Sequence, residues 1–124
     1  MKPLPGWFRY TSWVMAALLA LCVALQYNDP DPIRWMLIYG AGMVVSVLLP
    51  MKRELAVMGI VVGAAALVWA IVLTMHVWGV IELGDLWKKM SEKGGAVEEG
   101  REAGGMWIEA VWLCAASAFR RMRA

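Results

Sequence analysis

The stretch LAVMGIVVGAAALVWAIVLTMHVWGV, residues 55–80, decides the fold class of this chain. Its only titratable side chain is His76. A helix needs about 20 predominantly apolar residues to cross the hydrocarbon core of a bilayer, and this stretch is longer than that. Gly59 and Gly63 form a G-x-x-x-G pair, which favours close packing against a neighbouring helix. The stretch therefore predicts a packed transmembrane helix.

The composition of the whole chain agrees with a membrane protein. The 124 residues are 61% hydrophobic, and the mean hydropathy is +0.60, more than a soluble domain of this size can bury. The net charge of +2 comes from residues that lie almost wholly between and beyond the apolar blocks, without a basic stripe along any predicted helix. This excludes nucleic acid as a partner and leaves the lipid bilayer as the expected environment.

Three more apolar blocks flank the central stretch, at residues 10–27, 33–49 and 103–119. Together the four blocks predict an all-α membrane protein, a single domain of four transmembrane helices with an outer loop at 81–102. The last block has about 17 residues and contains Glu109, so it is at the lower limit for a span.

The first block follows two basic residues, Lys2 and Arg9, as the apolar region of a signal peptide would. It lacks a small-x-small cleavage site, so we expect a retained helix.

The distribution of basic residues predicts the orientation of the helices. Positive charge is concentrated on the side of both termini, which the positive-inside rule assigns to the cytoplasm. The expected location is a bacterial cytoplasmic membrane. The basic residues on this side are Lys2, Arg9, Lys52, Arg53, Arg120, Arg121 and Arg123.

A tight turn is predicted between the first two helices, in the sequence NDPDP at residues 28–32. Asp29 and Asp31 each precede a proline, which disfavours the helical conformation for both aspartates. Asp31 and Pro32 also suit the N-cap and first position of the next helix.

In this topology, polar side chains gather at the outer face. They are candidates for a ligand-binding site or for a structural clamp in which Arg101 pairs with Glu98 or reaches Asp29. The candidates are Gln26, Asn28, Asp29, Asp31, Glu98, Glu99, Arg101 and Glu102.

Two titratable residues are predicted inside the membrane near the outer face, His76 and Glu109, each about one helical turn deep. An acid there costs up to about 2.5–3.5 kcal/mol, so a partner is expected. The simplest interpretation is a structural hydrogen-bonded pair. The alternatives are proton handling or a metal site formed with Asp29. No cofactor is assigned, and because no serine or cysteine lies beside a base, no catalytic residue is predicted.

Two motifs resemble the transmembrane protein 220 family. They are QYNDPDP at residues 26–32, followed by Trp35 and Tyr39, and EEGRE at residues 98–102, followed by Gly105. The resemblance implies a small multi-pass membrane protein and brings no reaction, cofactor or substrate. His76 and Glu109 belong to neither motif.

Two functional hypotheses follow. The favoured one is a structural or interaction protein, not an enzyme, whose outer polar surface organises the bundle or docks a membrane-protein partner or a second copy. The alternative is a membrane protein that binds a metal or small ligand at that surface, with enzymatic activity left open.

Overall fold

The computed structural model describes residues 3–26, 32–78 and 96–123, and within them the chain forms four α-helices. In chain order these are α1 (Gly6–Leu25), α2 (Pro32–Leu48), α3 (Leu55–Val77) and α4 (Ala96–Arg121).

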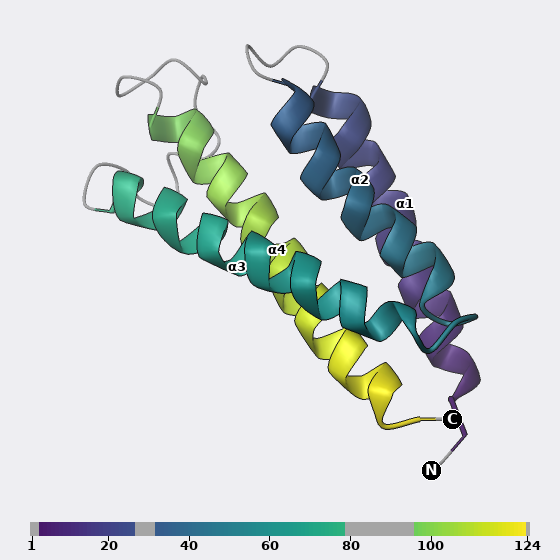
Figure 1. Ribbon diagram of the computed structural model, residues 1–124. Helices are drawn as coiled ribbons and strands as arrows, with labels where there is room; N and C mark the ends of the chain where they lie inside the picture. The colour runs from purple at the N-terminus through teal and green to yellow at the C-terminus, as the bar shows by residue number, and fades with distance from the viewer. Residues whose placement is uncertain (1–2, 27–31, 79–95, 124) are drawn as a thin grey trace.

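The helices alternate in direction. The start of α1, the turn between α2 and α3, and the end of α4 lie at one end of the bundle, which we call the proximal end (Figure 1). The end of α1, the start of α2, the end of α3 and the start of α4 lie at the other, distal end.

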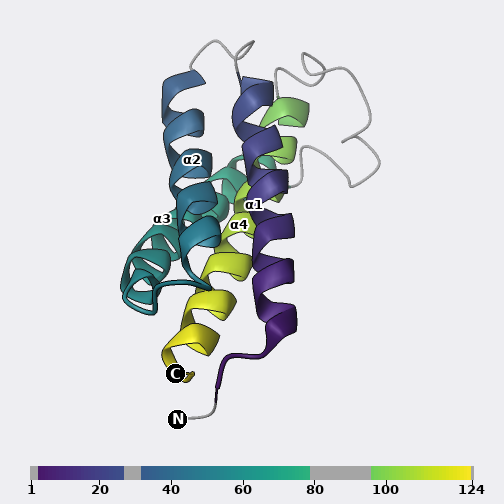
Figure 2. The same ribbon diagram turned by 90° about the vertical axis from the view of Figure 1, so that its right-hand side faces the viewer.

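Two antiparallel pairs build the bundle. α3 packs most extensively against α4, α1 packs against α2, and the pairs meet mainly where α2 contacts α3 and α4. Figure 2 shows α1 and α2 side by side, and in Figure 1 α3 is tilted relative to the other three helices.

Glycines allow the close approach of α3 to α4. A Cβ atom added at Gly59 would overlap Ser117 Oγ, and one at Gly63 would lie 3.1 Å from the backbone nitrogen of Cys114. The packing predicted from the G-x-x-x-G pair is therefore confirmed.

The surface of the bundle is apolar, and its interior contains small and polar residues. Large side chains such as Leu18, Leu37 and Val61 are exposed, whereas Ser12 and Ser46 are buried. Soluble monomers rarely expose apolar side chains this extensively, so the arrangement suits a lipid surrounding. Two helices, Gly6–Leu25 and Leu55–His76, are long and apolar enough to cross a membrane, and α2 is a shorter apolar helix.

The core consists of two apolar clusters, one towards each end. The distal cluster contains Leu19, Trp35, Tyr39, Ala66, Ala70, Leu73, Ala103, Met106 and Ala110. The proximal cluster contains Phe8, Val45, Leu49, Ala56, Leu113 and Ala116.

Helix boundaries differ from the predicted blocks mainly in α1 and α4. α1 begins at Gly6, ahead of the predicted block 10–27, because Pro5 ends the preceding extended segment and accepts a 3.2 Å hydrogen bond from the Phe8 amide. Phe8 then stacks on Phe119 of α4, with ring centroids 5.3 Å apart, which packs the first turn against the bundle.

α4 begins at Ala96, well before the predicted block 103–119. Glu98 and Glu99 are good helix formers, and their charge suits the first turn of a helix. Glu109 thus lies 13 residues after the start of α4 (109 − 96) and 12 before its end (121 − 109). Glu109 therefore sits in the middle of the helix, and its depth of about one turn below the membrane surface stays a prediction.

Candidate functional site

The most unusual side chain in the core is that of Glu109, which is 0% exposed. It lies between the two apolar clusters, since Met106, one turn before it on α4, belongs to the distal cluster and Leu113, one turn after it, belongs to the proximal one. Its carboxyl group points at Gly42 of α2, where an added Cβ would overlap Oε1 and lie 3.0 Å from Cδ. The same position is 3.3 Å from a methyl carbon of Leu19 on α1. Glycine at position 42 therefore makes the room for the carboxyl group.

A second contact between α2 and α4 mirrors the first. The Tyr39 hydroxyl lies against Gly105, where an added Cβ would overlap it. Tyr39 and Gly42 are three residues apart and Gly105 and Glu109 are four apart, so the two contacts lie on neighbouring turns of the same interface. Each helix contributes one large side chain and one glycine to this interface, which we call the α2–α4 seam.

The oxygens of Glu109 are buried without a hydrogen-bond partner among the described residues. Some polar side chains of the core are paired, since Ser12 donates to the Ser46 carbonyl oxygen at 2.5 Å and Trp112 Nε1 donates to Ser46 Oγ at 2.9 Å, whereas Trp35 Nε1 and Ser117 Oγ are also buried without a partner among the described residues. A buried polar group without a partner costs about 1–3 kcal/mol. Glu109 therefore places two strong acceptors where none of the described residues donates a hydrogen bond to them.

The titratable neighbours of Glu109 lie on its distal side. Cys22 on α1 and Tyr39 on α2 are within electrostatic range of its carboxyl group, and Tyr39 is also within range of Glu102. They are protic or acidic groups, so this neighbourhood does not supply a positive charge that would neutralise a carboxylate.

Part of the predicted outer polar surface lies in the described residues. The Gln26 side chain donates a 3.1 Å hydrogen bond to the Cys22 carbonyl oxygen within its own helix. Arg101 and Glu102 are half-buried, and each interacts with another residue.

The other predicted surface residues are placed less completely. Asn28, Asp29 and Asp31 lie outside the described residues, and of Glu98 and Glu99 only the helical backbone is described.

The predicted metal ligands are not brought together in the described part of the chain. His76 is exposed in the last turn of α3, whereas the carboxyl group of Glu109 faces α2 and accepts no hydrogen bond from a described residue. Asp29 lies outside the described residues. Within the described ranges there is no group of three or more His, Cys, Asp or Glu that could hold a metal ion.

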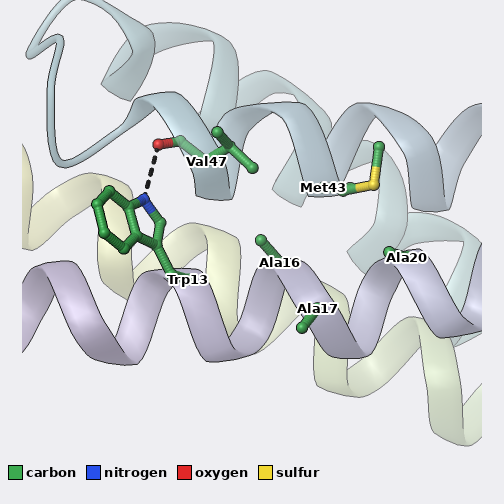
Figure 3. A pocket seen from close by; sticks show the side chains of 6 residues that line it. All are labelled: Trp13, Ala16, Ala17, Ala20, Met43 and Val47. Atoms are coloured by element: carbon green, nitrogen blue, oxygen red, sulfur yellow. Dashed lines mark hydrogen bonds between the residues drawn. The ribbon is translucent and has the colours of Figure 1, made fainter.

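Apolar grooves lie on the surface formed by the described residues. One, of about 350 Å³, runs between α1 and α2, where Ala16 and Ala20 face Met43 and the Trp13 ring donates to the Val47 carbonyl oxygen (Figure 3). Another, of about 500 Å³, is lined by Met15, Trp107, Ile108, Val111, Trp112 and Ala115. Glu109 lines neither groove, so the seam site is separate from both.

At the distal end, aromatic stacking joins α2 to α3. The Trp35 and Trp69 rings stack at 4.3 Å, and the Arg34 guanidinium lies 5.2 Å and 5.6 Å from their centroids. This stack belongs to the same distal cluster as Tyr39. The stack therefore packs α3 against α2, the helix that contributes Tyr39 and Gly42 to the seam.

The fit of Tyr39 against Gly105 predicts a compensating pair of substitutions. We expect Gly105→Ala to lower the free energy of unfolding by about 1–3 kcal/mol, because the new methyl group overlaps the tyrosine hydroxyl. Adding Tyr39→Phe should recover most of this loss, since it removes only the overlapping atom. Thermal unfolding of the two single variants and the double variant would measure the coupling. If Gly105→Ala lowers the free energy of unfolding equally in the parent and in the Tyr39→Phe variant, the contact between the Tyr39 hydroxyl and Gly105 is contradicted.

No solved structure matches this chain. A family model described as "Transmembrane family 220, helix" matches residues 18–117, from the middle of α1 to near the end of α4. The match covers most of the chain and includes every residue of the α2–α4 seam. The chain therefore belongs to transmembrane family 220.

Proposed function

We propose that this chain is a four-span membrane protein that binds a small ion or polar solute at Glu109. The observation that carries the proposal is the burial of both carboxyl oxygens in the middle of α4 without a hydrogen-bond partner among the described residues. An ionisable residue inside a membrane marks a functional site by default, because it opposes insertion and rarely remains unpaired.

The energetics support binding over packing. A purely structural carboxyl group would repay its burial through hydrogen bonds, as Ser12 and Trp112 do on either side of Ser46. Glu109 forms none with the described residues, so it contributes acceptors without stabilising the ligand-free bundle. A bound species that donates to these oxygens would offset the cost.

The orientation we propose places the proximal end in the cytoplasm. That end holds Arg53, Arg120 and Arg121, and two of their side chains reach across helices. Arg120 Nε donates to the Leu49 carbonyl oxygen at 2.9 Å, and the Arg53 guanidinium donates to the Arg121 carbonyl oxygen. Their concentration at one end supports the positive-inside assignment, with α2 and α4 as the remaining two spans. A bacterial cytoplasmic membrane is part of the same proposal.

A structural or interaction role for the outer polar surface is the second candidate. It is favoured by Arg101 and Glu102, each of which interacts with another residue. Side chains occupied in this way suit a clamp that ties helix ends together, or a surface against a membrane-protein partner or a second copy of the chain. This role is compatible with binding at Glu109, which lies deeper in the bundle.

Ligand-dependent stability distinguishes the two candidates. Detergent-purified protein would be heated over a series of pH values and in separate Na⁺, K⁺ and ammonium salts, with Glu109→Gln and Arg101→Ala beside the parent. We expect a ligand- or proton-dependent rise in the midpoint in the parent and in Arg101→Ala, and its loss in Glu109→Gln. A ligand at 100 times its Kd stabilises by about 2.7 kcal/mol. Parent and Glu109→Gln behaving alike under every condition would refute binding at Glu109.

A further inference from the structure

We infer that the species bound at Glu109 is the proton, and that it enters and leaves from the distal end of the bundle. This inference rests on the proposed function, in which Glu109 is the binding site. It adds the identity of the ligand and the direction of access.

The space around Glu109 favours a proton over a metal cation. Oε1 occupies the place where a side chain at Gly42 would begin, and a methyl carbon of Leu19 closes the same position. A bound Ca²⁺ needs six to eight oxygen ligands, and Mg²⁺ needs an octahedral set. The described residues do not assemble a third acidic, histidine or cysteine ligand here. A proton needs no coordination shell and binds directly to a carboxyl oxygen.

The charges facing the site also favour the protonated acid. The titratable groups within electrostatic range of it are Cys22 from α1 and Tyr39 from α2, and Tyr39 is in turn within range of Glu102 on α4. The only titratable residue of α3 is His76, which is exposed in the last turn. A carboxylate among these groups would be buried without a hydrogen-bonded cation, whereas binding a proton makes it neutral and removes the largest part of the desolvation cost.

Access is asymmetric because the two sides of Glu109 differ in chemistry. On the distal side, the hydroxyl of Tyr39 lies one turn away along the seam, followed by Glu102, which is half-buried. One turn is about 5.4 Å, which a bridging water can span.

On the proximal side, Val45, Leu49 and Leu113 are completely buried and form an apolar layer. Beside this layer, the Ser12 hydroxyl donates to the Ser46 carbonyl oxygen, and the Ser46 hydroxyl accepts a hydrogen bond from Trp112 Nε1. Towards the distal end a proton therefore meets a phenol and a carboxyl group, whereas towards the proximal end it meets an apolar layer and serine hydroxyls.

Infrared spectroscopy of the full chain in lipid vesicles tests both parts of the inference. A neutral carboxylic acid has a carbonyl stretch that is distinct from the carboxylate bands and shifts on deuteration. The samples would be the parent, Glu109→Gln, Tyr39→Phe and Ser117→Ala, transferred from H₂O to D₂O at neutral pH. Ser117→Ala is the matched control, because Ser117 is also a buried hydroxyl residue against a glycine but lies on the proximal side.

We expect the acid band in the parent and its loss in Glu109→Gln. Deuteration of the band should slow about tenfold in Tyr39→Phe, the rate change that corresponds to about 1.4 kcal/mol in a barrier, and stay unchanged in Ser117→Ala. A purely structural role of the Tyr39 hydroxyl would change the unfolding midpoint without changing this exchange rate.

Other outcomes would distinguish among proton binding, binding of another species at Glu109, and distal access. An absent acid band, together with a cation-dependent midpoint lost in Glu109→Gln, would overturn the proton and leave binding at Glu109 standing. An absent band without any ligand-dependent midpoint would overturn both. A band whose deuteration is slowed by Ser117→Ala, or is not slowed by Tyr39→Phe, would overturn distal access.

Discussion

Replacing Glu109 with leucine is expected to raise the free energy of unfolding of the ligand-free protein by about 1–3 kcal/mol. The substitution removes two buried acceptors that receive no hydrogen bond from the described residues and fills a similar volume between the distal and proximal clusters. Few core substitutions in a natural protein are expected to stabilise it. This one should, because replacing an unsatisfied polar group with a well-packed apolar one removes a desolvation penalty without removing a contact.

Denaturation in a mild detergent, followed by tryptophan fluorescence, would measure this effect. Glu109→Gln is the control, because it keeps polar atoms buried at the same position and should gain less than the leucine variant. The stabilised leucine variant should also lose every ligand- or proton-dependent shift of its midpoint. A leucine variant less stable than the parent would show that Glu109 is an essential part of the packed core.

The largest loss of stability is expected from Gly63→Leu, at about 3 kcal/mol or more. A Cβ atom at this position would lie 3.1 Å from the backbone nitrogen of Cys114 and 3.1 Å from Leu113 Cβ. A flexible side chain could rotate away from such a contact, but the backbone of α4 cannot. The extra carbons of leucine would therefore have to push α3 and α4 apart along their most extensive interface.

Size-exclusion profiles and thermal midpoints of Gly63→Ala and Gly63→Leu should show a graded loss. Gly104→Ala and Gly40→Ala are matched controls, because an added Cβ meets nothing within 4 Å at either glycine. Each control should gain up to about 1 kcal/mol from improved helix propensity. Similar midpoints for Gly63→Leu and the controls would mean that α3 and α4 do not approach each other this closely.

The features that could be predicted from sequence are those set by local composition. The positions of the helices follow from long apolar runs, and the approach of α3 to α4 follows from the spacing of Gly59 and Gly63. The extension of α4 back to Ala96 was harder to predict, because Gly100, Gly104 and Gly105 argue against a helix that the neighbouring glutamates favour. Because the glycines disfavour a helix and the glutamates favour one, helix propensity alone does not decide where α4 begins.

The candidate site depends on tertiary structure and was only partly accessible. Glu109 was singled out by its charge, but its neighbours depend on how α4 is rotated about its axis. The expected partner was His76, whereas the structure turns Glu109 towards Gly42, a residue without a chemical signature of its own. The sequence signal that could have located this contact is a glycine in one apolar helix, Gly42, at a depth similar to that of an acid in another helix, Glu109.

The seam also fixes how α2 and α4 can move. Its two side chains project in opposite directions, Tyr39 from α2 into α4 and Glu109 from α4 into α2. Sliding either helix along its axis would drive both side chains off their glycines and against residues that carry a Cβ. The interface therefore has one axial register, and rearrangement between these helices must proceed by separation rather than by stepwise sliding. Any access route to Glu109 opens by parting the distal halves of α2 and α4 while their register is kept.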